Sequence, residues 1–152
     1  MLTAIPKSLW SYDYEVREAG SLVATIDTPW WGENSTLTID GRVWLLGRGG
    51  FVNPMFTLFH GGRTLASATK PSAFFRSFQV AFDDAYYCWE AEGVFKRSFV
   101  LREGNRVIGS LWPESVLART AKVDLPREFP LERQCFLVWL AILIWRREQA
   151  LA

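Results

Sequence analysis

Hydrophobic and polar residues alternate along most of this chain in short segments separated by turn signals. In WSYDYEV, Trp10, Tyr12, Tyr14 and Val16 fall on one face of an extended chain and polar residues on the other, which is the period of a β-strand. Ten more segments of strand-like composition follow before residue 126: SLVATI, LTI, RVWLL, MFTLF, TLASAT, FFRSFQVAF, YYCWEA, VFKRSFVL, RVIGSLW and TAKVDL. The pattern predicts about eleven strands between residues 9 and 125.

Turn signals recur about every ten residues, which is typical of an antiparallel all-β protein. Asp40-Gly41 between LTI and RVWLL is the strongest of them, because both residues tolerate the positive φ angles of a tight hairpin. The sequence shows no convincing repeat and no linker. We therefore expect residues 1–152 to form one domain.

The pattern changes after Leu125, where two prolines precede an uninterrupted stretch without glycine or proline. Pro130 suits the start of a helix, and Glu132 near its start and Arg146-Arg147 near its end would complement the helix dipole. We expect a helix from about 130 to 149. Its middle, CFLVWLAILIW, is apolar on every side, so every face must be buried.

The length of the apolar run indicates what buries it. Cys135 to Trp145 is 11 residues, whereas a bilayer span needs about 20. About eleven strands joined by short turns could close around one helix, and a barrel of that size has a lumen that its own side chains cannot fill. We predict a mainly β fold, a closed antiparallel β-barrel around a central hydrophobic C-terminal α-helix. A tail-anchored membrane protein stays an alternative.

Composition and charge restrict the possible functions only modestly. The chain has 17 Lys and Arg against 16 Asp and Glu, so no nucleic-acid partner is expected. The N-terminus lacks the apolar segment of a secretory signal, and the two cysteines, Cys88 and Cys135, do not form a disulfide framework. We expect a cytoplasmic protein, and membrane association stays open.

The residues that usually carry catalysis are scarce. His60 is the only histidine, and no G-x-S-x-G nucleophile motif accompanies it. One histidine and two distant cysteines do not provide a zinc ligand set. The prediction is a protein that is not an enzyme and has no metal and no cofactor.

Many short strands followed by the ending LERQCFLVWLAILIWRR, together with the Asp-Gly hairpin, resemble the tubby-like superfamily. This superfamily comprises tubby C-terminal, phospholipid scramblase and LURP-one-related domains, and the resemblance covers nearly the whole chain. It implies a closed barrel of twelve strands around a C-terminal helix. It implies little chemistry, although tubby domains bind phosphoinositide head groups through Lys and Arg. The cysteine run and the calcium segment of scramblases are not found here.

Two arginines interrupt the alternation. Arg76 shares an apolar face with Phe78 in FFRSFQVAF, and Arg97 shares one with Phe99 in VFKRSFVL. Each must find a partner or reach the rim. One interpretation is a salt bridge to Glu132 or another acid. The other is an anion or head-group site formed by Arg76, Arg97 and Lys70.

The function hypothesis is a binding module that recognises anionic lipid head groups, phosphoinositides among them, or a protein partner at the barrel surface. Trp30-Trp31 in the TPWWGENS loop would either cap the barrel or dip into a membrane interface. A hydrophobic-ligand carrier is a further alternative, but it requires an empty lumen. The sequence predicts neither the ligand nor the oligomeric state.

Overall fold

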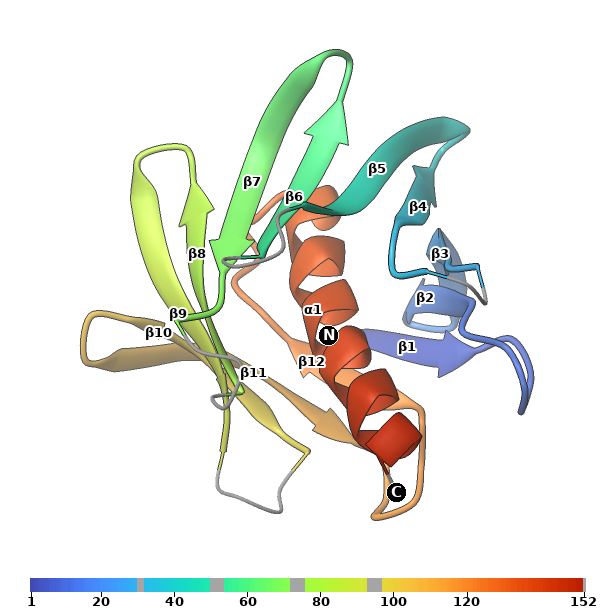
Figure 1. Ribbon diagram of the computed structural model, residues 1–152. Coiled ribbons are helices and arrows are strands. Elements are labelled where there is room, and N and C mark those ends of the chain that lie inside the picture. Colours follow the sequence, from blue (N-terminus) through green and yellow to red (C-terminus); the bar gives the residue numbers. More distant parts are fainter. Residues whose placement is uncertain (30–31, 50–53, 72–75, 93–96, 152) are drawn as a thin grey trace.

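In the computed structural model, the described residues form twelve strands and one helix (Figure 1). The structure describes residues 1–29, 32–49, 54–71, 76–92 and 97–151. The strands are β1 (Leu2–Pro6), β2 (Tyr14–Glu18), β3 (Ser21–Asp27), β4 (Ser35–Ile39), β5 (Arg42–Gly49), β6 (Met55–His60), β7 (Arg63–Thr69), β8 (Ser77–Phe82), β9 (Ala85–Ala91), β10 (Phe99–Glu103), β11 (Arg106–Pro113) and β12 (Ala121–Asp124). The helix is α1 (Leu131–Leu151).

The strands close into one antiparallel barrel in the order of the sequence. β1 completes the ring, because Leu2 lies opposite Glu18 of β2 on one side and opposite Val123 of β12 on the other. Closure pairs every strand of the barrel on both sides and so removes the exposed edges that promote aggregation. The predicted fold class is therefore confirmed.

The expected start of the strands was wrong. The first strand begins at Leu2, and the segment WSYDYEV is a strand only from Tyr14 onward. Residues 7–13 form a loop that the backbone hydrogen bond from Lys7 N to Asp13 O closes at 2.9 Å. Trp10 continues the alternation in the sequence but is 78% exposed. Hydrophobic periodicity alone therefore led to the wrong prediction of a strand in this loop.

The helix fills the barrel, as Figure 1 shows, and supplies the centre of the core. Every residue from Cys135 to Ala141 has no exposed surface, which explains why this segment is apolar on all sides. Two buried tryptophans satisfy their indole N–H groups across the interior. Trp139 Nε1 donates to Ser35 Oγ at 3.0 Å, and Trp89 Nε1 donates to the carbonyl of Leu137 at 3.0 Å.

The helix starts and ends close to the expected residues. The carbonyl of Pro130 accepts bonds from the amides of Arg133 and Gln134, so Pro130 stands just before the helix, where its missing N–H costs nothing. Glu132 lies in the first turn, as expected, but the helix continues to Leu151. Arg146 and Arg147 therefore precede the last turn and contact the barrel instead.

One end of the barrel, here called the hairpin end, carries five two-residue turns and the connection 125–130 into α1. Both residues have positive φ at Ala19-Gly20, Asp40-Gly41 and Gly61-Gly62, which is the geometry of the type I′ hairpin. Asp83 and Gly104, in the last two of these turns, also have positive φ. The five two-residue turns, at 19–20, 40–41, 61–62, 83–84 and 104–105, follow one another at intervals of 21 or 22 residues.

The opposite end, here called the mouth, carries longer connections and the last turns of α1. Its connections are residues 7–13, 28–34, 50–54, 70–76, 92–98 and 114–120. Loops held on a rigid scaffold are where binding residues concentrate. The mouth is therefore the first place to examine for a functional site.

Candidate functional site

The C-terminal part of α1 is fastened to the mouth by an arginine–glutamate pair. Arg147 donates two parallel hydrogen bonds to Glu33, at 2.8 and 2.7 Å, which is the strongest geometry for such a pair. Arg48 Nη1 lies 3.6 Å from the same carboxylate. Burial raises the pKa of Glu33, but the bonds and charge of Arg147, with the charge of Arg48, outweigh it and keep that pKa below its ordinary value.

Lys70 lies at the mouth, immediately after β7. Its ammonium is 5.9 Å from the ring centre of Phe78, and the side chain is partly buried. Burial and the positive charges of Arg147 and Arg48 lower the pKa of Lys70, whereas Glu33 and Glu148 act in the opposite direction. Two cations, Arg147 and Arg48, and two carboxylates, Glu33 and Glu148, therefore lie near enough to act on this ammonium.

Arg76 precedes β8 rather than lying within it, which corrects the expected strand FFRSFQVAF. Its Nε lies 2.9 Å from Glu148 Oε1 of the helix, an ion pair rather than an aligned hydrogen bond. Its carbonyl accepts a bond from the amide of Ala91 at 2.9 Å. Arg76 therefore has an acidic partner, as the first interpretation required, but this partner is Glu148 and not Glu132.

Arg97 also precedes its strand, since β10 begins at Phe99. Its guanidinium stacks 4.2 Å from the ring centre of Trp145, and Nη1 donates to the carbonyl of Val116 at 3.2 Å. Within the described residues no carboxylate pairs with Arg97, and its buried Nη2 has no hydrogen-bond partner. Burial lowers the pKa of this guanidinium, which nevertheless stays charged at neutral pH.

The three predicted site residues therefore converge on one end of the barrel. Glu148 pairs with Arg76 at 2.9 Å, and its charge acts on both Lys70 and Arg97. The reason for predicting the two arginines was incomplete, however. They do not interrupt the inner face of a strand, because both stand at the rim, just before their strands begin.

Two further arginines at the mouth were missed by sequence reasoning. Arg146 stacks 4.2 Å from the ring centre of Tyr12, and Arg119 lies 5.7 Å from the same ring. Arg146 also donates to the carbonyl of Gly32 at 2.8 Å. Arg119 stands in an ordinary polar loop, and nothing in its local pattern distinguishes it, so only the approach of residues 7–13 and 114–120 reveals its position.

Together these side chains form a cluster, here called the basic mouth. It contains seven cations around the end of the helix: Arg48, Lys70, Arg76, Arg97, Arg119, Arg146 and Arg147. Glu33 and Glu148 are the carboxylates that pair with its members within the described residues. Positive charge thus exceeds negative charge locally, although the whole chain is close to neutral.

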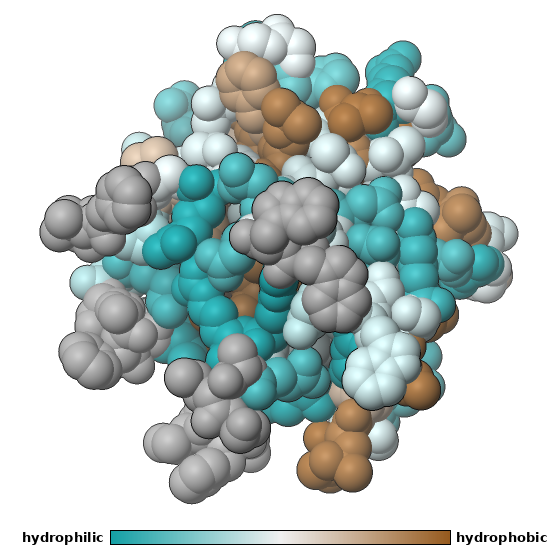
Figure 2. All heavy atoms as spheres, turned by 45° about the vertical axis from the view of Figure 1, so that its right-hand side comes forward, coloured by the Kyte–Doolittle hydropathy of each residue, from teal (hydrophilic) through white to brown (hydrophobic). Residues whose placement is uncertain are grey.

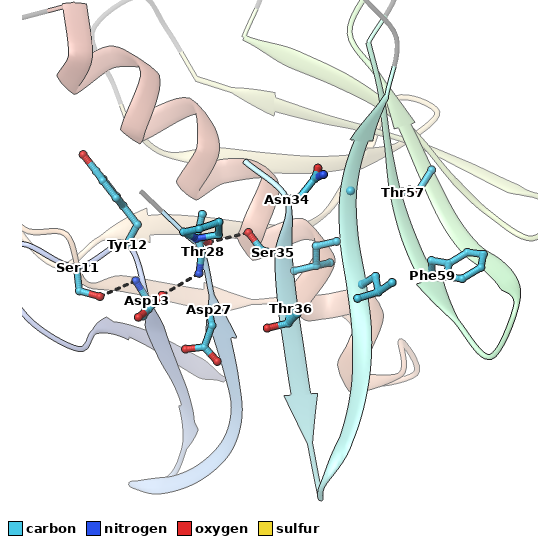
Figure 3. Close-up of a pocket in the computed structure, with 14 residues that line it drawn as sticks. Ser11, Tyr12, Asp13, Asp27, Thr28, Asn34, Ser35, Thr36, Thr57 and Phe59 are labelled. Atoms are coloured by element: carbon cyan, nitrogen blue, oxygen red, sulfur yellow. Dashed lines mark hydrogen bonds between the residues drawn. The ribbon is translucent and has the colours of Figure 1, made fainter. Parts of the chain in front are cut away.

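A second feature is a groove, shown in Figure 3, with a volume of about 820 Å³, which is lined by the mouth connections 7–13 and 28–34 and by strands β3 to β6. Leu45 and Phe59 provide apolar surface, and Asp13 and Asp27 provide two carboxylates. Both carboxylates already have partners, because Asp13 accepts the amide of Thr28 at 2.8 Å and Asp27 pairs with Lys7 at 2.9 Å. The groove therefore offers less unsatisfied binding chemistry than the basic mouth.

Other chemically active side chains are dispersed. His60 ends β6, where Nδ1 is 2.9 Å from the carbonyl of Val43 and the ring stacks on Trp44 at 4.6 Å. Burial raises the pKa of the Cys135 thiol to about 12. The pKa of Cys88 is also raised, mainly by burial and to a smaller extent by the charge of Glu90. Within the described residues, no three His, Cys, Asp or Glu side chains are placed to hold a metal ion together.

Comparison with known proteins leaves this geometry without a named relative. No family model, no curated protein and no solved structure matches the chain. Across the described residues, no helix combines the length and the apolar character needed to cross a bilayer. The Trp30-Trp31 pair, for which capping and membrane contact were both considered, lies outside the described residues.

Proposed function

We propose that this chain is a non-enzymatic binding module whose basic mouth recognises phosphate-bearing anionic head groups, phosphoinositides among them. The observation that carries the proposal is the concentration of seven cations and two carboxylates around the end of α1. Arginine suits phosphate oxygens because its guanidinium presents several donors in one plane. The tubby-like resemblance of the sequence supports the same class of ligand.

The three residues expected from sequence have different roles in this proposal. Arg97 is the principal anion contact, because it has a buried guanidinium nitrogen without a hydrogen-bond partner and no carboxylate pairs with it among the described residues. Lys70 contributes a further cation in the neighbourhood of Arg147 and Arg48, so a bound anion would be attracted by all three charges. Arg76 holds Glu148 and thereby limits the negative charge of the helix end.

The alternatives from sequence receive less support. A carrier of hydrophobic ligands needs an empty lumen, and α1 occupies it with side chains that have no exposed surface between Cys135 and Ala141. A protein partner at the mouth would have to bring acidic groups to the same cations. Titration with a small phosphate ester separates a protein partner from a phosphate ligand. If the mouth needs the acidic surface of a protein, the small phosphate ester should not bind.

The test is a titration with inositol trisphosphate that is monitored by isothermal titration calorimetry. Wild-type protein should bind, and Lys70→Gln and Arg97→Gln should each weaken binding about fivefold, since one cation near an anionic surface contributes about 1 kcal/mol. Arg106→Gln is the matched control, because Arg106 is 75% exposed at the hairpin end. Urea denaturation checks that both mouth variants are folded. Absence of binding, or an equal effect of the control, would refute the proposal.

A further inference from the structure

Two neighbouring loops of the mouth, residues 7–13 and 114–120, present apolar side chains to solvent. We call them the tip loops. Leu9 and Trp10 are 85% and 78% exposed, and Val116 and Leu117 are 85% and 91% exposed. These are the largest exposed fractions among the large hydrophobic residues that the structure describes. Burying a leucine removes about 1.5–3 kcal/mol of unfavourable hydration, so exposing four such side chains invites a partner.

The tip loops are held in place rather than left to collapse. Arg119 of one loop donates to the carbonyls of Ser8, Leu9 and Ser11 of the other, at 3.2 Å for Ser8 and 2.8 Å for Leu9. The turn in the second loop closes with a bond from Ala118 N to Ser115 O at 3.1 Å. The hydrogen bonds of Arg119 thus hold the two loops together while their apolar side chains point outward.

The tip loops are also joined to the basic mouth. Arg97 donates to the carbonyl of Val116 at 3.2 Å, and its own carbonyl accepts the indole N–H of Trp145 at 3.0 Å. Arg119 lies 5.7 Å from Tyr12, the ring on which Arg146 stacks. At the same end, Asp27 pairs with Lys7 and Glu114 with Lys122, so these acids do not cancel the excess of positive charge. Exposed apolar side chains and an excess of positive charge therefore share one end of the molecule.

The apolar surface is divided rather than continuous. On the flank of the barrel drawn in Figure 2, hydrophobic atoms form separate groups near the top, the right and the bottom of the outline, with hydrophilic atoms between them. A protein-binding surface usually has one contiguous apolar centre with a polar rim. Isolated apolar points above a basic surface instead match a membrane interface, where each side chain can enter separately and cations meet the head groups.

The sequence of the other connections at the mouth has the same character. The four are TPWWGEN, GFVNP, KPSAFFR and EGVFKRS, and each contains two adjacent apolar residues. All four of these apolar pairs lie outside the described part of the chain. The recurrence nevertheless shows that apolar pairs in these connections are a regular feature of the sequence.

We infer that the tip loops insert Leu9, Trp10, Val116 and Leu117 into the interfacial region of an anionic bilayer, with the mouth facing the membrane. Tryptophan prefers this region because its ring is apolar and its N–H is polar. Arg97 and Arg119 then lie at the level of the lipid phosphates. This inference rests on the proposed function of the basic mouth and adds a binding mode and an orientation to it.

The test is co-sedimentation with vesicles of phosphatidylcholine containing phosphatidylserine. Trp10→Ser and Leu117→Ser should each weaken binding about tenfold, the effect of losing one buried apolar side chain. Their matched controls are Tyr86→Ser and Leu22→Ser, at side chains that are 75% and 51% exposed but lie away from the mouth, on β9 and β3. Each control should bind as the wild type does.

A second measurement separates insertion from simple adsorption. Brominated lipid should quench part of the tryptophan fluorescence of the wild type, and Trp10→Phe, which stays apolar, should bind vesicles but lose part of the quenching. If the tip variants bind as the wild type does, or if no quenching occurs, the insertion inference is wrong. Binding of inositol trisphosphate would show in either case whether the basic mouth functions, so the two proposals can fail separately.

Discussion

The two ends of the barrel differ in how their connections are built. At the hairpin end, five connections have two residues each, whereas at the mouth the connections have five to seven. The short turns follow from local chemistry, because positive φ at pairs such as Asp40-Gly41 creates a type I′ turn without help from the rest of the protein. The long connections are instead held by the helix, through contacts such as Arg147–Glu33 and Trp145–Arg97.

This difference indicates which end can acquire a function. A two-residue hairpin has no room for a binding side chain, since both residues are committed to the turn. A connection of seven residues can present side chains, and the central helix supplies a rigid support against which they pack. The basic mouth and the tip loops both stand on that support.

The largest expected effect on stability comes from a substitution in the buried middle of α1, against which the barrel packs. Trp139 has no exposed surface, packs against Phe56 and Phe136, and donates to Ser35. Trp139→Ala should lower the free energy of unfolding by about 3–5 kcal/mol, the usual cost of deleting a large buried aromatic side chain. Urea denaturation measures the change.

Trp10→Ala is the control for that substitution, because Trp10 belongs to a tip loop and is 78% exposed. It should change the free energy of unfolding by less than about 0.5 kcal/mol. A comparable loss in both variants would mean that the mouth contributes to stability as much as the helix does.

The next effect compares the two ends directly through glycine. Gly41 at the hairpin end has φ +75°, whereas Gly32 at the mouth has no neighbouring atom within 4 Å of an added Cβ and no positive φ. Gly41→Ala should cost about 1–2 kcal/mol because an L-residue is strained in that region. Gly32→Ala should be neutral or slightly stabilising.

Thermal unfolding of the two glycine variants provides the measurement. If Gly32→Ala proved as destabilising as Gly41→Ala, the mouth would depend on local backbone conformation in the same way as the hairpin end. The distinction between the two ends would then be wrong.

The smallest effect concerns the ion pair that anchors the mouth. Glu33→Gln should lower the free energy of unfolding by about 1 kcal/mol at neutral pH, because both side chains of the Glu33–Arg147 pair remain partly exposed and water screens it. The pKa of Glu33 is held below its ordinary value of 4.5 in the folded protein. Its stabilising contribution is thus complete above that value and is lost as the pH falls through the lower, folded pKa.

Unfolding measured between neutral and acidic pH separates this contribution from others. The difference between wild type and Glu33→Gln should shrink as Glu33 becomes protonated. Lys7→Gln, which removes the more exposed Lys7–Asp27 pair, should cost less. A difference that stays constant down to acidic pH would show that Glu33 does not act through its charge.

Much of the fold was predictable from the sequence because its strongest signals are local. Asp40-Gly41 marks a hairpin by its chemistry, and Cys135 to Trp145 marks an enclosed helix by having no polar side. β1 was missed because LTAIP has little regular alternation, and the loop around Trp10 was mistaken for a strand because its alternation is regular. Hydrophobic periodicity does not distinguish a side chain that packs inward from one that points to solvent.

The candidate site was predictable only in part. Arg76 and Arg97 could be selected because a charged residue beside aromatic residues needs an explanation, whereas no such pattern marks Lys70. The sequence suggested that these three residues could share a site but not at which end of the barrel. It gave no sign of the roles of Arg119 and Arg146, whose contacts join segments more than 100 residues apart. No local pattern encodes such a contact, because it depends on closure of the barrel around the helix.

The sequence by itself determined that a helix whose middle, Cys135 to Trp145, is apolar on every side needs an enclosure. It also determined that tight turns divide the preceding chain into strands. Both requirements arise from short-range chemistry, namely the cost of hydrating apolar side chains and the φ angles that turn residues tolerate. The tertiary structure alone decided at which end of the barrel the C-terminal part of α1 lies and which charged side chains meet there. Those outcomes depend on the order in which twelve strands close into a ring, and that closure is a property of the whole chain.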